Sequence, residues 1–390
     1  MSIMSNGFFL LGNNIYNKKL NNGYILPNEI AGKLKLCEKE DTLKYLPESA
    51  KDYLNVKGII DISKKNNNSI CVESDMNECR LFIQLTNKCN LNCKHCFVES
   101  DMQKKDYFTF DRVVNLINDA VKHGINRIDF TGGEVFTQSY FIDVLKYLDC
   151  QPVSYSFFTN LSISNEKILS DLVQLKGLMC VITSLDYFDE KKHNDFRGSK
   201  NAYQTTLMNI LRLREQGVKV VVNIMVMNDN HDDVERLTDF FLSKDIEVHF
   251  DTVIECGRAK CNAFNNQNDE DNIRFINQLL KKIEMKGVRV DNLIGSCGVS
   301  KTLIFTHYSG EFMVCPGLTA DILPSYALGY DLEKAWEKVK NMGLDCTEKE
   351  CDYWKECSHG CRLRALVDNG SDKAPDRMMC RLLRVRESGE

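Results

Sequence analysis

The chain has 390 residues, of which 43% are hydrophobic and 27% are charged, and its formal net charge is −5. This composition indicates a globular protein of two or three domains, and a slightly acidic balance without long charge runs argues against a nucleic-acid partner. We find no run of roughly 18 apolar residues and no signal-peptide pattern at the start, so a cytoplasmic protein without a membrane partner is expected. In that compartment the 17 cysteines indicate metal ligation rather than disulfides.

Residues 1–80 differ in pattern from the rest of the chain. Short strands are expected at 8–11 and 24–26 between Asn- and Gly-rich turns, followed by helical turns over 41–54 and a strand over 57–62. This pattern predicts a small α+β unit, which we interpret either as winged-helix-like or as a simple extension that covers one end of the next domain.

From Arg80 onward, β-branched runs alternate with amphipathic helical stretches. The predicted strands cover 81–86, 126–131, 153–159, 179–185, 218–226 and 246–253. The predicted helices between them cover 110–123, 138–148, 165–176, 201–216 and 232–244. Six strands with crossover helices predict an α/β fold, a partial (β/α)6 TIM barrel, because six units are too few for the full eight-stranded barrel.

A helix over 269–286 leads into a C-terminal region that is short of long periodic segments but rich in cysteine. Three domains are therefore expected: 1–80, 81–290 and 291–390. Ligands of such barrels gather at the C-terminal ends of the strands, which directs attention to the residues that follow the first two predicted strands.

Three cysteines, Cys89, Cys93 and Cys96, follow the first barrel strand. Three thiolates on one loop can hold three corners of a cubane iron–sulfur cluster and leave one iron open for chemistry. A zinc site is the alternative, with His95 inside the run as a further ligand. The next strand ends in Gly132-Gly133-Glu134, where paired glycines let the backbone approach a ligand and a carboxylate can accept from an ammonium.

These two motifs together resemble the radical S-adenosylmethionine (SAM) superfamily. The resemblance implies that Cys89, Cys93 and Cys96 bind a [4Fe–4S] cluster, whose open iron is chelated by SAM, and that the enzyme generates a 5′-deoxyadenosyl radical that abstracts hydrogen. It also implies that Gly132, Gly133 and Glu134 contact the SAM amine and that the His95 backbone touches adenine. Val135 stands where Pro is common in the family.

Further SAM contacts follow from the same resemblance. Ser184 and Asp186, after the fourth strand, suit ribose hydroxyls, although a helix N-cap uses the same residue types. Arg197 resembles the family arginine that pairs with the SAM carboxylate, and a surface loop arginine is its plain alternative. Thr159-Asn160 ends strand three in a similar way, and Asn223 and Asn228, around the end of strand five, are weaker candidates.

The C-terminal cysteines resemble the SPASM extension of peptide-modifying radical SAM enzymes, which implies two auxiliary [4Fe–4S] clusters. The outer cluster would use Cys346, Cys351, Cys357 and Cys380, and the inner one Cys297, Cys315 and Cys361. The fourth inner position would be Cys256, Cys261 or open. One departure is the four residues between Cys346 and Cys351, where the family has two, and a zinc-binding module is the alternative. Gly257-Arg258-Ala259 after strand six is a further weak marker of the family.

The resemblance implies a cytoplasmic oxidoreductase that modifies a ribosomally made precursor peptide by a thioether or other crosslink. Residues 1–80 would recognise the leader of that peptide, and a flavodoxin or ferredoxin would donate electrons. Alternatives are an anaerobic sulfatase maturase, a SAM-dependent dehydrogenase of a small molecule, and a non-enzymatic iron–sulfur electron carrier. Sulfatase maturation ranks low because Pro316-Gly317 follow Cys315, where that subgroup has an aspartate base.

Overall fold

A computed structural model describes most of the chain from residue 79 onward and short strands before it. The described residues are 2–3, 8–11, 14–17, 22–25, 71–72, 79–262, 269–286, 299, 302–343, 346–348, 351–353, 357 and 360–388. The predicted helical turns over 41–54, the strand over 57–62 and the ligand candidate Cys297 lie outside these residues.

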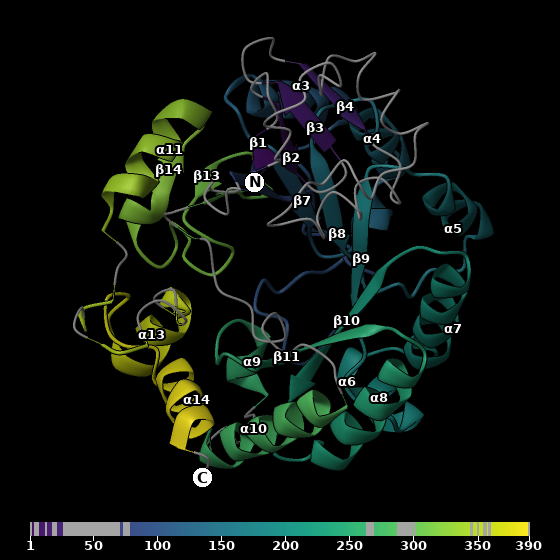
Figure 1. Cartoon of the computed structure of the whole chain (residues 1–390), viewed down its shortest axis with the longest axis vertical. Helices are drawn as coiled ribbons and strands as arrows, with labels where there is room; N and C mark the ends of the chain where they lie inside the picture. The colour runs from purple at the N-terminus through teal and green to yellow at the C-terminus, as the bar shows by residue number, and fades with distance from the viewer. Residues whose placement is uncertain are drawn as a thin grey trace, which may run out of the picture.

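Six parallel strands form the centre of the molecule and curve into an open barrel (Figure 1). They are β6 (Arg80–Gln84), β7 (Arg127–Thr131), β8 (Ser154–Phe158), β9 (Leu178–Ser184), β10 (Val220–Val226) and β11 (Glu247–Thr252). The helices outside them are α3 (Phe110–Lys122), α4 (Phe141–Leu148), α5 (Glu166–Val173), α7 (Ala202–Glu215), α8 (His231–Ser243) and α10 (Asp269–Met285). The predicted fold class, a partial α/β barrel, is confirmed, with element bounds within a few residues of those expected.

Alternation along each strand explains why the barrel forms. In β6, Leu81 and Ile83 are fully buried in the core shared with the helices, whereas Phe82 packs against Phe305 on the inner face. Helix α3 buries Val113 and Ile117 at helical spacing against that outer face. Each strand is thus covered on both sides, as parallel sheets require.

The C-terminal region contains more regular structure than its sequence pattern indicates. Strand β12 (Leu303–Thr306) pairs in parallel with β6, and β13 (Phe312–Met313) and β14 (Ala327–Gly329) continue the sheet in antiparallel fashion. The helices are α11 (Leu332–Asn341), α13 (Arg362–Asn369) and α14 (Arg377–Ser388). Strands of two to four residues are too short to show a period, which is why the sequence pattern did not indicate them.

The same region reaches the other edge of the barrel. Helix α14 packs along α10, and Arg364 of α13 donates to Asp251 and Thr252 at the end of β11, at 3.3 and 3.2 Å. Since β12 is bonded to β6, the C-terminal segment connects the first and last barrel strands, and Figure 1 shows it completing the ring.

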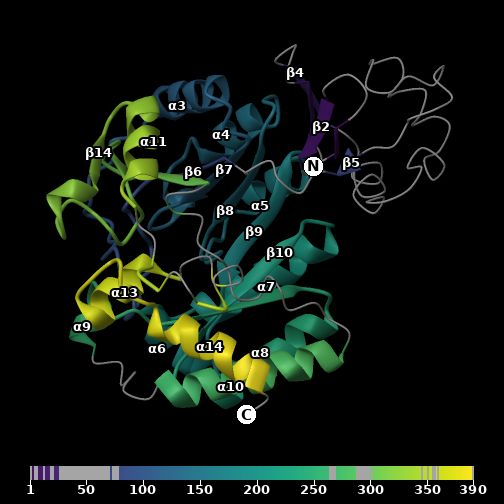
Figure 2. The same cartoon turned by 60° about the vertical axis from the view of Figure 1, so that its left-hand side comes forward.

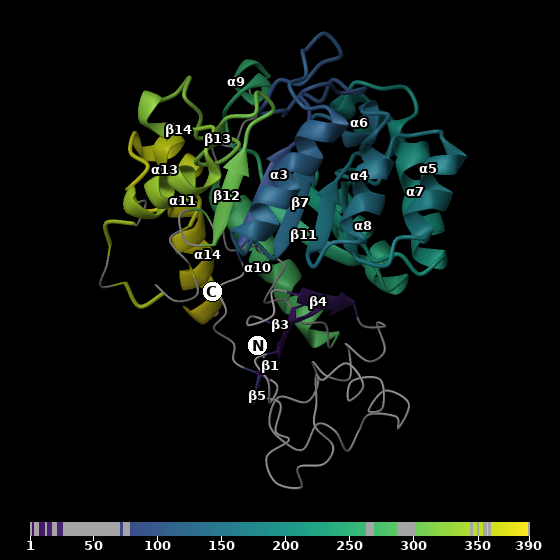
Figure 3. The same cartoon turned by 90° about the horizontal axis from the view of Figure 1, so that it is seen from above.

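The N-terminal strands form two small sheets of their own. One pairs β1 (Ser2–Ile3) with β5 (Cys71–Val72), and the other has the order β2 (Phe8–Leu11), β3 (Asn14–Asn17), β4 (Asn22–Ile25). They lie at the end of the barrel opposite the short helix α9 (Arg258–Cys261), as Figures 2 and 3 show from two directions. Among the described residues, no helix combines the length and apolarity needed to cross a membrane.

Candidate active site at the cysteine loop

The loop after β6 carries the three predicted cluster ligands. Cys93 is buried, and Cys89 and Cys96 are half-buried. Burial, reinforced by the nearby Glu134 carboxylate and the other two thiols, raises the pKa of Cys89 to about 12. Burial also raises the pKa of Cys93, so the thiols of Cys89 and Cys93 stay protonated at neutral pH unless a metal cation displaces the proton, which is how metal ligation normally ionises a buried cysteine.

The donor set fits a cluster better than a single ion. Within the described part of the chain, no three Cys, His, Asp or Glu side chains are gathered tightly enough to share one metal ion. Ligands of a zinc ion sit about 2.3 Å from the metal when they are thiolates, so they crowd together. The thiols of Cys93 and Cys96 still lie near enough to raise the pKa of Cys89, and three such thiols suit the corners of a polynuclear iron–sulfur centre.

The paired glycines pack the end of β7 directly against the cysteine loop. Gly133 N donates to Thr86 O at 2.9 Å, and Glu134 N donates to Lys88 O at 2.7 Å. A β-carbon on Gly133 would lie 2.2 Å from Lys88 O, and one on Gly132 would lie 2.8 Å from Thr86 O. Only glycine fits at either position without moving the backbone that leads into Cys89.

Glu134 is turned into the protein rather than toward the loop's open side. Its carboxylate accepts from Asn160 N at 2.7 Å, from Thr159 Oγ1 at 2.8 Å and from Phe136 N at 3.1 Å, and the residue is 1% exposed. The sequence suggested a carboxylate that accepts from an ammonium. In this arrangement the carboxylate organises the end of β8, and the contact of the motif with the SAM amine stays a prediction.

Arg258 holds the far side of the loop. Its backbone N donates to Cys96 O at 3.0 Å, its Nε to Cys93 O at 2.9 Å and its Nη1 to Ser100 O at 2.9 Å. Gly257 before it has φ +55°, and a β-carbon there would lie 2.7 Å from Cys96 O. The tripeptide that was only a weak sequence marker is therefore the segment that positions two of the three cysteines.

A buried ion pair lies beneath the loop. Arg197 donates through Nε and Nη2 to Asp186 Oδ2 at 2.8 and 2.6 Å, and its Nη1 donates to Cys93 Sγ at 3.8 Å. Both residues are less than a tenth exposed, and Asp186 Oδ1 also accepts from Met225 N. The structure thus brings together two residues for which the sequence suggested separate SAM contacts, and the carboxylate orients the guanidinium.

Helix α6 (Glu190–Arg197) explains how Arg197 reaches this position. The helix was not predicted, because its eight mostly polar residues show no apolar stripe, and it ends at Gly198, whose φ of +65° suits only glycine well. The loop is bonded to its last turn, since Asn92 N donates to Arg197 O at 3.1 Å and Lys94 N to Phe196 O at 2.9 Å.

His95 and Ser184 occupy different surroundings. The His95 ring stacks on Phe196 at 4.6 Å with an angle of 1°, and burial lowers its pKa well below the usual value, so the ring is neutral. The ring is thus occupied by packing within the protein, and the contact of the His95 backbone with adenine stays a prediction. Ser184 is half-exposed at the end of β9, in register with Asn223 of β10.

Asn160 reaches the loop from the end of β8. Its Nδ2 donates to Cys89 Sγ at 3.9 Å and to Asn90 Oδ1 at 2.8 Å. The sequence indicated Asn160 only as a polar residue at a strand end, similar in position to Ser184 and Asp186. Its contact with a cluster cysteine appears only in the folded chain.

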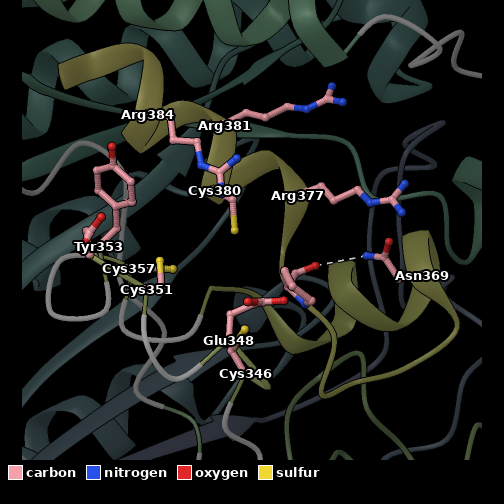
Figure 4. Close-up of a pocket in the computed structure, with 12 residues that line it drawn as sticks. Cys346, Glu348, Cys351, Tyr353, Cys357, Asn369, Arg377, Cys380, Arg381 and Arg384 are labelled. Carbon is pink, nitrogen blue, oxygen red and sulfur yellow. Dashed lines mark hydrogen bonds between the residues drawn. The ribbon is translucent and has the colours of Figure 1, made fainter. Parts of the chain in front are cut away.

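The outer set of C-terminal cysteines surrounds one cavity of about 800 Å³, shown in Figure 4. Cys346, Cys351, Cys357 and Cys380 all line it. Burial and the neighbouring thiol of Cys380 raise the pKa of Cys357 to about 11. Burial and the Asp376 carboxylate raise the pKa of Cys380, with smaller effects from Cys346 and Cys351. Four cysteines spread over 35 residues of sequence are therefore brought around one space.

The two described cysteines of the inner set come from adjoining turns. Gly317, two residues after Cys315, packs so closely on Leu363 that a β-carbon would lie 2.2 Å from its Cδ2, and Leu363 follows Cys361 by two residues. Of the suggested fourth ligands, Cys256 lies within electrostatic range of Cys96, and Cys261 is exposed on α9. The identity of that ligand stays a prediction.

Comparison with known proteins shows which family and which relatives this chain resembles. Residues 83–241 match the Radical SAM superfamily. The chain is 23% identical over 362 residues to the antilisterial bacteriocin subtilosin biosynthesis protein AlbA of Bacillus subtilis, a match that covers 83% of this chain and 78% of AlbA.

Two solved structures share the fold. Streptococcus suis SuiB bound to its precursor peptide SuiA aligns with 97% of this chain and 100% of SuiB, with a TM-score of 0.61 and 15% identity. The enzyme anSMEcpe with bound AdoMet aligns with 80% of this chain and 100% of its own, with a TM-score of 0.62 and 19% identity.

Proposed function

We propose that this chain, which is a radical SAM enzyme, modifies a ribosomally made precursor peptide by installing a thioether or another crosslink. The observation that carries the proposal is the extent of the AlbA match, which runs over 83% of the chain and so continues well beyond residues 83–241. A similarity confined to the barrel would fit any radical SAM reaction. One that includes the flanking regions favours the peptide-processing class.

Residues for the cofactors are present at the barrel mouth. Cys89, Cys93 and Cys96 would hold a [4Fe–4S] cluster. The backbone of Gly132, Gly133 and Glu134, the Arg197 guanidinium and the region of His95, Ser184 and Asp186 would hold SAM. When bound, cluster and SAM together supply the capacity to abstract a hydrogen atom from an unactivated C–H bond.

The protein's own contribution is positioning. Arg258 fixes the carbonyl groups of Cys93 and Cys96, and Asp186 fixes the direction of Arg197 toward Cys93 Sγ. These groups are set by backbone and buried contacts, so they require little rearrangement when ligands bind. Closure of the ring by α13 and α14 shields the inner side of the barrel from bulk water.

The C-terminal cysteines would hold two auxiliary clusters. Cys346, Cys351, Cys357 and Cys380 would bind the outer one, and Cys297, Cys315 and Cys361 the inner one. If the fourth inner position is open rather than filled by Cys256 or Cys261, it can take a substrate thiolate. That option suits thioether formation, because the sulfur would then be held beside the peptide carbon that reacts.

The small N-terminal sheets would recognise the leader of the peptide. In the three-stranded sheet, β2 and β4 are both edge strands, and a leader can add to such an edge by main-chain hydrogen bonds. SuiB, which has been seen with its precursor peptide, shares the fold over nearly the whole chain, whereas anSMEcpe aligns with a smaller share.

Sulfatase maturation is the second candidate, favoured only by the fold shared with anSMEcpe. The residue after Cys315 is Pro316, which offers no base, and Gly317 is packed against Leu363. A small-molecule dehydrogenase would instead show turnover without any peptide.

Anaerobic reconstitution tests the proposal directly. We expect about twelve irons per chain, four for each of three clusters, and 5′-deoxyadenosine formation that a cognate precursor peptide stimulates. About four irons would contradict the auxiliary clusters. Cleavage of SAM that persists after Cys89, Cys93 and Cys96 are replaced by Ala would contradict the cluster assignment itself.

A further inference from the structure

Helix α14 carries a stripe of arginines on its outer face. Arg377, Arg381 and Arg384 are spaced four and three residues apart, which places them on one side of the helix, and all three are exposed. On the other side, Met378 and Leu382 are buried, and the helix packs against α10. The helix holds four arginines and one glutamate in a chain whose net charge is −5, so it is a local basic surface.

This arginine stripe borders the cavity of the outer cysteine set. Arg377, Arg381 and Arg384 line that cavity together with Cys346, Cys351, Cys357 and Cys380, and the carboxylates of Glu348 and Asp352 line it as well. In Figure 4 the side chains of Arg377 and Arg381 extend outward, away from the four thiols, so their charge lies at the outer side of the cavity. Arg384 is close enough to lower the pKa of Cys380 against the stronger effect of burial. Arg381 is oriented by an ion pair with Glu270 of α10 at 3.4 Å.

The stripe is separate from the SAM site. None of the residues that line this cavity belongs to the loop of Cys89, Cys93 and Cys96 or to the glycine motif. The arginines form a basic surface beside the proposed outer cluster and away from the proposed SAM site. Such a surface suits a protein that donates electrons rather than the substrate that is modified. Long-range attraction then steers an acidic partner so that its redox group approaches the cavity.

We propose that the arginine stripe of α14 is the docking surface for an acidic one-electron carrier protein that reduces the outer auxiliary cluster. The step is a single electron transfer. With a flavodoxin, the flavin hydroquinone is oxidised to the semiquinone and releases one proton at most, and the cluster held by the four cysteines gains one electron. The inference deepens the proposed function and rests on it, because it requires the outer cluster.

The test uses the full-length, iron-loaded protein and an acidic bacterial flavodoxin as the probe. We expect calorimetry to give an affinity that falls steeply between low and physiological salt, because the contact is charge-driven. The variant R377E/R384E should bind the flavodoxin at least ~10-fold more weakly at low salt, and stopped-flow oxidation of its hydroquinone should slow in parallel. Arg381 is left intact because its pair with Glu270 also ties α14 to α10.

A matched control carries the same change in charge elsewhere. Lys122, in the last turn of α3, and Lys176, after α5, are both exposed, so K122E/K176E should bind as the wild type does. Should R377E/R384E lose iron, R377Q/R384Q and the salt dependence of the unmodified protein provide the same test. Wild-type affinity in the variant, equal losses in the control, or an affinity indifferent to salt would overturn the proposal.

Two further outcomes keep the inference separate from the proposed function. If R377E/R384E lowers the affinity for a precursor peptide and not for the flavodoxin, the stripe serves the peptide and the proposal is wrong. Iron counts and SAM cleavage with dithionite are measured on the unmodified protein without any carrier. A low iron count or no SAM cleavage in that measurement contradicts the proposed function. A normal iron count and normal SAM cleavage, together with flavodoxin binding that R377E/R384E does not weaken, contradict only this inference.

Discussion

The two cysteine regions are built on opposite principles. The loop of Cys89, Cys93 and Cys96 is hydrogen-bonded to three elements: the glycine motif of β7, the last turn of α6 and Arg258 after β11. Cys346, Cys351, Cys357 and Cys380 instead surround a cavity of about 800 Å³ and come from several short turns and one helix. The first region is thus organised by protein contacts in the absence of a metal, whereas the second would depend on the proposed cluster to fill its cavity and connect its cysteines.

The largest expected effect separates the two regions by chemistry. Cys93→Ala should reduce SAM cleavage to background, because it removes a corner of the site where SAM would bind. Cys351→Ala should remove about four irons and stop peptide modification while SAM cleavage by dithionite-reduced protein persists. Iron analysis and 5′-deoxyadenosine quantification measure both. The exposed Cys150 provides the control Cys150→Ala, and equal loss of cleavage in both cluster variants would remove the distinction.

A smaller effect is expected when the hydrogen bonds from Arg258 to the first cysteine loop are removed. Arg258→Ala removes two side-chain hydrogen bonds to the carbonyls of Cys93 and Ser100 and should lower the rate of SAM cleavage roughly 100-fold, because small misplacements of reacting groups are costly. Arg258→Lys should recover part of the rate, since it can restore one bond. The neighbouring exposed Lys260→Ala should leave the rate unchanged. Unchanged SAM cleavage in Arg258→Ala would show that the cysteine loop keeps its position without the Arg258 side chain.

Iron removal tests the comparison without any mutation. Hydrogen exchange on iron-free and reconstituted protein should show a larger loss of protection in 360–388 than in 80–131. The first loop is bonded by backbone contacts to three neighbouring elements, whereas the four outer cysteines surround a cavity that a cluster would fill. Equal loss in the two segments would mean that the cysteine loop of the barrel also depends on its metal.

The smallest expected effect concerns the barrel edge alone. Hydrogen bonds from His249 and Lys219 lower the pKa of Glu247 to about 2, below the ordinary value of 4.5. A carboxylate with a lowered folded-state pKa stabilises the fold above about pH 4.5, and this contribution is lost as the pH falls toward 2. Urea unfolding of iron-free protein between pH 5 and pH 3 should therefore show a smaller decrease in stability for Glu247→Gln than for the wild type. An identical pH dependence would exclude this pair as a source of acid sensitivity.

Long periodic elements were predictable from the sequence, and short ones were not. The β10 run of Val220–Val226 and the stripe of α3 follow from apolar spacing alone. Helix α6 and strands β12 to β14 have few residues and no apolar period, and they form because they are bonded to neighbours far away in sequence. Tertiary contacts therefore decide the elements that sequence patterns miss.

The candidate site divides in the same way. Cysteine spacing and the glycine pair were visible in the sequence, because each uses a residue type that few others can replace. Three other features were not visible in the sequence, since each depends on which groups meet after folding. They are the inward orientation of Glu134, the ion pair of Asp186 with Arg197 and the hydrogen bonds of Arg258 to the cysteine loop. Sequence motifs thus located the site, and only the folded chain shows what each polar residue does there.

The connection that the C-terminal segment makes between β6 and β11 limits how the molecule can be taken apart. Through β12 and Arg364 this segment is a strap that connects the two edge strands of the open barrel. Cutting the chain after residue 290 would remove the strap together with the cysteines, and the first and last strands would lose their tether. The two halves are consequently not interchangeable modules, and a chimera that exchanges the cysteine-rich half must also supply matching contacts for both edges of the barrel.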